Sequence, residues 1–154
     1  MTSIISSFVR AIPVSLLMFV LLPIGAQADA RVNLTVEGTN GPHTFQIEVM
    51  QSAEDRARGL MFRRALDADA GMLFDFRTDG IARMWMKNTY IPLDMLFIAD
   101  NGQITSIAEN TVPLTDTRIS SGREVRGVLE IGGGLVATLG LRPGDFVRHP
   151  AFPR

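Results

Sequence analysis

Apolar and polar residues alternate along two neighbouring stretches of the chain, Arg31 to Glu37 and His43 to Met50. A period of two residues is typical of strands that bury one face. The residues between them, Gly38 to Pro42, are rich in glycine, asparagine and proline and therefore favour a turn. The pattern predicts a β-hairpin.

A short helix is expected after this hairpin. Ser52 is a candidate N-cap, and Asp55 follows it three residues later. Glu54 and Arg58 have the i,i+4 spacing of an ion pair on a helix, and Gly59 then interrupts the pattern.

Strand signals return from Gly71 onward. We expect a strand over Gly71–Phe76, a turn at Arg77–Gly80 and a strand over Ala82–Lys87 that pairs back. After the loop Asn88–Pro92, a third strand is expected over Leu93–Ala99. Its partner is expected over 103–109, because Asp100-Asn101-Gly102 between apolar runs is a strong hairpin signal.

The last third of the chain continues this pattern. Thr111–Gly122 has no sustained period and predicts a long loop, while Glu124–Ile131 predicts another strand. Three glycines, residues 132–134, then precede a helical turn over Leu135–Leu139 and a last strand over Phe146–Arg148. Many short strands with frequent turns predict an all-β fold, a sandwich, jelly-roll-like or barrel domain with one or two short helices.

The N-terminal segment has the features of a signal peptide. Arg10 is its one charged side chain, an apolar run covers Ala11–Gly25, and Ala26-Gln27-Ala28 matches a cleavage site. The run is shorter than the roughly 20 residues of a membrane-spanning helix. We therefore expect cleavage after Ala28, a mature domain of residues 29–154 with no membrane span, and a periplasmic or secreted location.

Composition removes several classes of function. Without Arg10, 14 basic residues face 16 acidic ones, a net charge of −2, so no basic excess points to nucleic acid. The chain has no cysteine, which removes disulfides, thiolate catalysis and cysteine-based zinc sites. We expect one domain stabilised by packing.

Several sequence blocks resemble one known family. They are Glu54 to Arg63, Gly71-Met72-Leu73-Phe74, Trp85 to Thr89, Pro92-Leu93-Asp94, Val128-Leu129-Glu130 and Gly144-Asp145. In this order they resemble the domain of unknown function 192 family (DUF192), over nearly all of the mature chain. The resemblance implies a compact β-sandwich or jelly-roll-like domain, often exported, and supplies no activity, substrate or cofactor.

Lys87 is the first candidate for a site, because it is the one lysine among 15 basic residues. If the strands on either side of Asn88–Pro92 pair, Asp94 lies opposite Lys87, as a structural ion pair or as part of a ligand site. Trp85 would share a face with Lys87 and could stack on a planar ligand or belong to the core. Asn88 and Thr89 are turn residues or ligand donors.

Arg63 and Glu130 complete the candidate site. Glu130 stands in an apolar stretch that could bury it, and a buried carboxylate needs a partner such as Arg63 or Lys87. A mixed-charge cluster of Arg63, Lys87, Asp94 and Glu130 could perform acid–base chemistry if the pKa values of its two carboxyls diverge.

Two further patterns are interpreted as structural. Methionines 72, 84, 86 and 95 with His43 could bind copper through thioether and imidazole groups, but methionine also fills irregular cores. The three glycines 132–134 could hold an anion but favour a tight bend. We predict no metal and no cofactor.

Three functions remain open. The first is a binding module for a polar small molecule or an envelope component. The second is a hydrolase or lyase that uses Lys87 with Asp94 or Glu130, and the third is a structural partner of an envelope protein through a strand edge. An open pocket with a perturbed carboxyl would favour an enzyme, an open pocket without one would favour binding, and a dry ion pair would favour structure.

Overall fold

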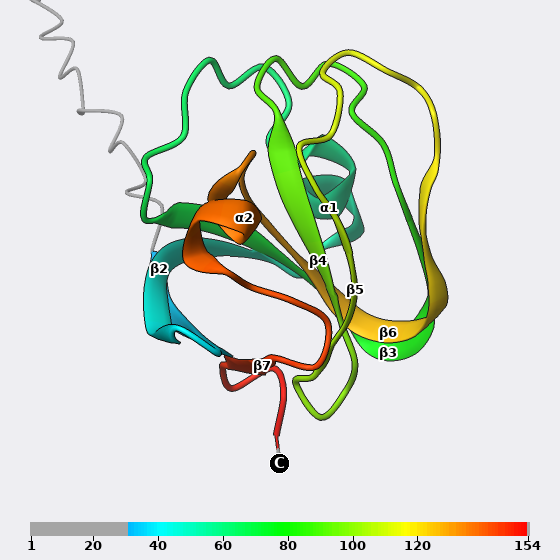
Figure 1. Cartoon of the computed structure of the whole chain (residues 1–154). Helices are drawn as coiled ribbons and strands as arrows, with labels where there is room; N and C mark the ends of the chain where they lie inside the picture. Colours follow the sequence, from blue (N-terminus) through cyan, green and yellow to red (C-terminus); the bar gives the residue numbers. More distant parts are fainter. Residues whose placement is uncertain (1–30, 154) are drawn as a thin grey trace, which may run out of the picture.

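Seven strands form one curled sheet with the shape of a half-barrel in the computed structural model, which describes residues 31–153 (Figure 1). The strand order is β5-β4-β6-β3-β2-β1-β7. The elements are β1 Val32–Gly38, β2 Gly41–Met50, α1 Ala53–Arg58, β3 Ala70–Met84, β4 Leu93–Ile98, β5 Ile104–Ala108, β6 Ile119–Gly132, α2 Leu135–Leu139 and β7 Phe146–Arg148. The all-β prediction is confirmed, with two short helices. The predicted signal peptide lies outside the described residues.

Local signals placed most of these elements correctly. β1 and β2 pair antiparallel as the expected hairpin, and so do β4 and β5. Helix α1 begins after Ser52, whose side-chain oxygen accepts a hydrogen bond from the Asp55 backbone N–H at 3.0 Å. Helix α2 follows the three glycines and ends at Gly140, which has a left-handed conformation. No helix among residues 31–153 is long and apolar enough to cross a bilayer.

The predicted hairpin over residues 71–87 is wrong. β3 runs without a reversal from Ala70 to Met84, and both of its halves pair with the long strand β6. Residues 76–79, which include most of the predicted turn Arg77–Gly80, form a bulge, because Asp75 pairs with Gly127 while Gly80 pairs with Val125. Turn-forming residues therefore bend a strand here instead of reversing it.

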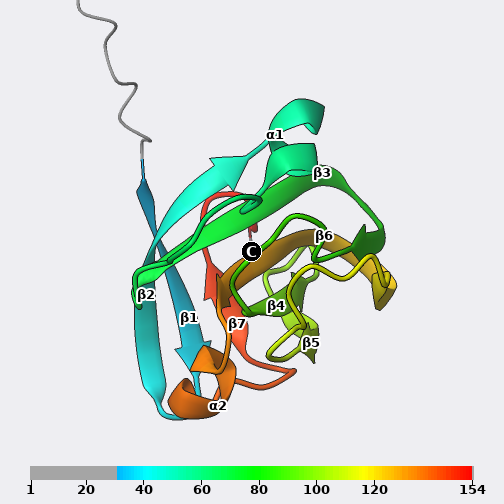
Figure 2. The ribbon, with the colours of Figure 1, turned by 90° about the horizontal axis from the view of Figure 1, so that it is seen from above.

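The first half of β3 also lies parallel to β2. A parallel pair needs a crossover connection, which α1 and residues 59–69 provide. The pattern of hairpins in the sequence gave no indication of this pairing. It matters for function because it places α1 beside the sheet (Figure 2).

The sheet has an apolar core on each of its two faces. One core packs beneath α2 and the C-terminal segment, and it includes Leu73, Leu129 and Val136. The other includes Met72, Met95 and Val125, because the far halves of β3 and β6 curl back over the face of β4. Figure 2 shows α1 and α2 on opposite sides of the molecule.

The two edge strands approach each other through the loops that precede them. An isolated bridge joins Gln103, just before β5, to Phe146 in β7. Backbone hydrogen bonds from Ile104 to Asp145 and from Val147 to Gly102, each 2.8 Å, reinforce it. The curled sheet is thereby tied together at its edges.

Candidate functional site

A cavity of about 210 Å³ opens between α1 and the far end of β3. We call it the α1 pocket. Apolar side chains form most of its wall, basic side chains stand around it, and one carboxyl lines it. The lining residues are Ala53, Arg56, Ala57, Arg58, Gly59, Leu60, Met61, Phe74, Phe76, Arg83, Met84, Trp85, Thr89 and Glu130.

Glu130 is the carboxyl of the α1 pocket. It lies on β6 and is 4% exposed, and within residues 31–153 its side chain takes part in no hydrogen bond or ion pair. Burial raises the pKa of this carboxyl from 4.5 to about 8, because water no longer stabilises the charged form. At neutral pH the side chain is therefore a neutral acid with a hydrogen to donate.

Strand register explains why the side chains around Glu130 are apolar. It pairs with Met72 of β3 on one side and with Met95 of β4 on the other. Both methionines are buried in the core on the same face of the sheet. The opposite side chains of a ladder stand about 5 Å apart, so two thioether side chains flank the carboxyl. Neither can replace the hydrogen bonds that water would give it.

Two other sequence-predicted residues join Glu130 in the α1 pocket. Trp85 and Thr89 both line it. The Arg118 guanidinium lies over the Trp85 ring, 4.7 Å from its centroid, so one face of the indole already carries a cation. The Thr89 hydroxyl donates a hydrogen bond to the Lys87 carbonyl at 3.3 Å, which is the turn role expected for it.

The basic residues of the α1 pocket were not in the predicted site. Arg56 and Arg58 come from α1, and Arg83 comes from the far half of β3. Arg56 donates to the backbone carbonyls of Gln51 and Asp75 and lies over Phe76. Arg58 and Arg83 are exposed and have no carboxylate partner among the described residues.

Gly59 gives the α1 pocket its shape. It ends α1 with a φ of 47°, and a Cβ built there would lie 2.9 Å from Cζ of Phe74. A side chain at this position would therefore collide with a wall of the pocket. Gly59 also lines a second hollow on the other side of the same chain segment, together with Arg58 and Met61.

The second hollow contains Arg63, which was predicted to belong to the site. Arg63 donates two hydrogen bonds of 2.5 Å to the two carboxylate oxygens of Glu48. Glu48 is 5% exposed and lies on β2, on the same sheet face as Glu130. The structure therefore gives Arg63 a buried partner that the sequence did not suggest, and it does not place Arg63 in the α1 pocket.

The predicted pair of Lys87 and Asp94 is wrong. Strand β4 pairs with β5 and β6 and not with the segment before it, so Lys87 does not face Asp94. The Asp94 carboxylate accepts hydrogen bonds from the backbone N–H groups of Asn110, at 2.6 Å, and Val136, at 2.7 Å. Lys87 is exposed and forms no ion pair within the described part of the chain.

The expected four-residue charge cluster is therefore not assembled. Asp94 faces α2, whereas Glu130 faces the α1 pocket, so the two carboxyls do not act together. Arg63 binds Glu48, and Lys87 points to solvent. The acid–base chemistry that depended on this cluster loses its basis.

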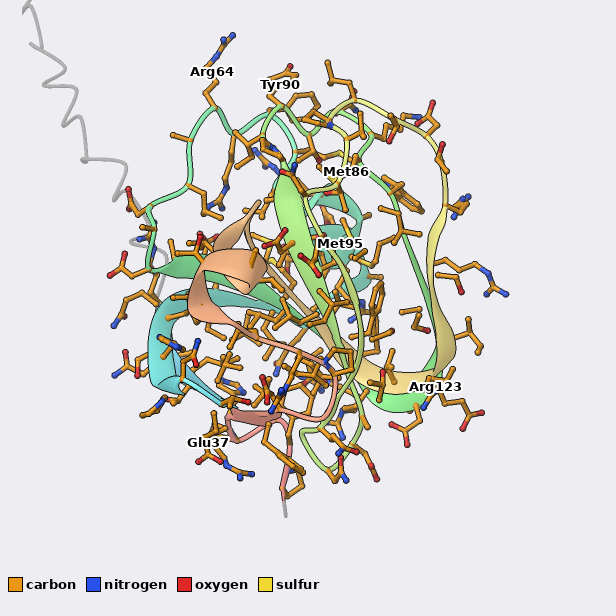
Figure 3. The ribbon with its side chains drawn as sticks, viewed as in Figure 1. Glu37, Arg64, Met86, Tyr90, Met95 and Arg123 are labelled. Atoms are coloured by element: carbon orange, nitrogen blue, oxygen red, sulfur yellow. The ribbon has the colours of Figure 1, made fainter. Side chains whose placement is uncertain are left out.

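Asn88 lies in the loop after β3, next to Thr89 of the α1 pocket, and does not line the pocket itself. It has a φ of 54°, and its carbonyl accepts a hydrogen bond of 2.8 Å from the Phe62 N–H. Phe62 and Tyr90 then meet edge to face with centroids 6.2 Å apart. Figure 3 shows Tyr90 beside Arg64 at one end of the molecule, far from Glu37 and Arg123. Asn88 is thus a turn residue of this loop.

Three of the four methionines that suggested copper are core residues, while Met84 is half-buried and lines the α1 pocket. Met72, Met86 and Met95 are 1% exposed or less and pack with phenylalanine and leucine side chains. Figure 3 shows Met86 and Met95 inside the molecule. Among the described residues, no three histidine, aspartate or glutamate side chains are close enough to hold a metal ion.

Comparison with known proteins places this chain in a family. The DUF192 family model, described as an uncharacterized ACR, matches residues 33–149. A comparison with curated proteins finds no match.

Two crystal structures resemble the chain closely. One is a candidate transcription regulator from Sinorhizobium meliloti 1021, with 42% identity and a TM-score of 0.77 over 79% of this chain and 95% of that one. The other is a protein of unknown function from Novosphingobium aromaticivorans DSM 12444, with 41% identity and a TM-score of 0.76 over 77% of this chain and 85% of that one. The chain belongs to the DUF192 family.

Proposed function

We propose that this protein is an exported domain that binds a small molecule in the α1 pocket. The observation that carries the proposal is Glu130, a buried carboxyl with no partner among the described residues that lines an open cavity. Buried polar groups are nearly always hydrogen-bonded, and because the Glu130 oxygens face the α1 pocket and no donor among the described residues, their partners must come from water or a ligand in that cavity. A ligand with a hydrogen-bond acceptor would satisfy the Glu130 hydroxyl.

The residues of the α1 pocket favour binding over hydrolysis. Acid–base hydrolysis generally uses two groups with separated pKa values. Among the lining residues, Glu130 is the one side chain that exchanges a proton near neutral pH, since the others are apolar, arginine or threonine. The lining also lacks a lysine or histidine that could serve as nucleophile or base.

An enzyme with Glu130 as general acid is the second candidate. A pKa near 8 in an accessible pocket suits a group that donates a proton at neutral pH. The observation that separates the two candidates is turnover. NMR spectra of a bound compound recorded over hours would show product for the enzyme and an unchanged compound for the binding domain.

The other functions receive less support. A partner at a strand edge is disfavoured because the Gln103–Phe146 bridge ties the two edges of the sheet together. One relative is described as a candidate transcription regulator, but α1 and α2, of six and five residues, are too short to serve as a DNA recognition helix. The chain's net charge of −1 also gives no attraction to phosphates.

Export is part of the proposal. It rests on the apolar run and the Ala26-Gln27-Ala28 motif of the sequence. N-terminal sequencing of protein from the extracytoplasmic fraction should begin at Asp29. A start at Met1 in the membrane fraction would contradict export without affecting the pocket.

Binding in the α1 pocket can be tested with two matched variants of α1. Ala57 lines the pocket and is exposed, so Ala57→Trp should fill the mouth without disturbing the core. Glu54→Trp places the same side chain on the same helix outside the lining. Saturation-transfer NMR with small acids, amides, alcohols, amines and sugars should find compounds whose signals vanish with Ala57→Trp and remain with Glu54→Trp. If every signal survives Ala57→Trp, the α1 pocket is not the binding site.

A further inference from the structure

The charges around the α1 pocket are strongly one-sided. Arg56, Arg58 and Arg83 line the pocket, and none of them has a carboxylate partner among the described residues. The guanidinium of Arg118, which lies over the ring of the lining residue Trp85, brings a fourth positive charge to the pocket. The one acidic residue in the lining is Glu130, which is buried behind them.

An unbalanced group of arginines attracts an anion. Guanidinium groups bind carboxylate and phosphate oxygens through paired N–H donors, and low-dielectric walls strengthen the attraction. Arg58 and Arg83 are exposed and come from opposite walls, α1 and β3, so their side chains are available at the mouth. Arg56 is committed to backbone carbonyls and contributes its charge.

The interior of the α1 pocket suits an apolar body. Leu60 and Phe74 are 2% and 3% exposed, and Phe76 and Met84 are partly buried beside them. Aromatic walls favour flat groups, since rings stack or meet edge to face at little entropic cost. The cavity of about 210 Å³ limits this body to a small molecule.

The Glu130 carboxyl limits the charge of the ligand's inner end. An anionic group next to the Glu130 carboxyl would be repelled as soon as that carboxyl ionises. A neutral hydrogen-bond acceptor would instead accept a hydrogen bond from the protonated carboxyl. Met72 and Met95, which flank Glu130, offer no compensating donor. A single negative charge at the outer end therefore fits the arrangement best.

The neighbouring hollow does not share this preference. Its lining includes Arg58 and Arg63, but also the carboxylates of Glu48 and Asp55, and Arg63 is bound to Glu48. Positive charge is therefore balanced there. Arg58 borders both hollows, whereas Arg56 and Arg83 line the α1 pocket alone, so the excess of positive charge is larger in the α1 pocket.

We infer that the α1 pocket takes a small organic monoanion with a flat apolar body, held at its charged end by Arg58 and Arg83 at the mouth. This inference rests on the proposed binding function and names its ligand class.

Four probes that share a phenyl ring and differ in their polar group test the ligand class: benzoate, benzamide, benzyl alcohol and benzylamine. Titrations of the purified full chain at pH 7, followed by NMR, should give the tightest binding for benzoate. Benzamide and benzyl alcohol should bind at least tenfold more weakly, because they lose charge-assisted hydrogen bonds, and benzylamine should not bind. Benzoate binding must also disappear with Ala57→Trp and persist with Glu54→Trp.

Single arginine variants test the assigned contacts. Arg58→Gln and Arg83→Gln should each weaken benzoate roughly tenfold and leave benzamide unchanged. Arg123→Gln is the matched control, since Arg123 is exposed on β6 and outside the lining, toward the end of the molecule opposite Tyr90 (Figure 3). All three side chains are exposed, so folding should be preserved.

The outcomes separate the two proposals. If benzamide binds as tightly as benzoate and both are blocked by Ala57→Trp, the α1 pocket binds ligands but the monoanion class is wrong. If benzylamine binds best, the class is also wrong. If no probe in this series or in the wider panel responds to Ala57→Trp, both the ligand class and the proposed function fail.

Discussion

Asp94 and Glu130 lie on adjacent strands but on opposite faces of the same sheet. Asp94 pairs with Ile131 and Met95 pairs with Glu130, so the two carboxyls are one residue out of register. Because successive side chains of a strand alternate between faces, Asp94 faces α2 and Glu130 faces the α1 pocket. One carboxyl therefore supports the fold, and the other has no structural partner among the described residues.

The role of Asp94 predicts a stability loss without a binding loss. Asp94→Ala removes the acceptor of the Asn110 and Val136 N–H groups, which are then left unsatisfied. We expect the free energy of unfolding to fall by at least about 3 kcal/mol, since two hydrogen bonds to a charged group are lost and each contributes about 1.5–3 kcal/mol. Urea unfolding measures this. Benzoate affinity of the folded protein should be unchanged.

Lys87, unlike Asp94, is expected to contribute little to stability. It is exposed and has no ion-pair partner among residues 31–153, so Lys87→Met should change the free energy of unfolding by less than about 0.5 kcal/mol. The same urea experiment decides it. If Lys87→Met causes a large loss and the double variant Lys87→Met with Asp94→Leu recovers it, the result would support the Lys87–Asp94 ion pair predicted from the sequence.

The Arg63–Glu48 pair predicts that arginine geometry matters. Arg63 donates to both oxygens of a nearly buried carboxylate. Arg63→Met should lower the free energy of unfolding by about 3 kcal/mol, because removing one partner of a buried pair leaves a charge without compensation. Arg63→Lys should recover only part of this, since an ammonium cannot form the double hydrogen bond. Equal stability of the two variants would contradict the assigned role.

Gly59 is expected to tolerate no side chain. Gly59→Ala should destabilise the protein by about 1–3 kcal/mol, because its φ of 47° is unfavourable for alanine and the new Cβ would lie 2.9 Å from the Phe74 ring. Thermal unfolding measures the loss. Gly80→Ala is the control, since a Cβ at Gly80 meets nothing within 4 Å and its φ is not positive. Comparable losses at both positions would remove the special role of Gly59.

Glu130 predicts an unusual dependence of stability on pH. Its pKa is 4.5 in the unfolded chain and about 8 in the folded protein. Between these values the unfolded chain has released the proton while the folded protein keeps it, so the free energy of unfolding falls by about 1.4 kcal/mol per pH unit from this group. The effect is absent below pH 4.5 and complete above pH 8.

Glu130→Gln isolates this contribution. Glutamine has the same shape and does not titrate, so the variant should gain stability over the native protein as the pH rises from 5 to about 8. Denaturant unfolding of both proteins at a series of pH values gives the difference. A difference that does not change with pH would mean that Glu130 titrates normally.

Sequence patterns predicted the parts of the fold that depend on residues close together in the sequence. The Ser52 cap, the hairpin at Asp100–Gly102 and the α2 turn after the three glycines all follow from local chemistry. The pairing of β3 with β2 and β6 does not, because it joins segments far apart in the chain and nothing local specifies it. A separate expectation, that Ala82–Lys87 pairs with Leu93–Ala99, placed Lys87 opposite Asp94, and the structure pairs β4 with β5 and β6 instead.

The candidate site was recovered in part for the same reason. Glu130 could be singled out because a charged residue in an apolar strand signals either a partner or a function. Trp85 and Thr89 were selected for their nearness to Lys87 and line the pocket for a different reason, the curl of β3. Arg56 and Arg58 stood in the block that resembles the family, but the crossover that carries α1 to Glu130 could not be read from the sequence.

Titration of the Glu130 carboxyl, monitored through its ¹³C chemical shift with and without saturating benzoate, tests the buried acid and the pocket together. In the free protein the midpoint should lie near pH 8. Benzoate should move the midpoint higher, because its apolar ring excludes water from the pocket and desolvation disfavours the charged form of the carboxyl. A midpoint near 4.5, the same with and without benzoate, would contradict both a buried neutral Glu130 and a ligand in the α1 pocket beside it.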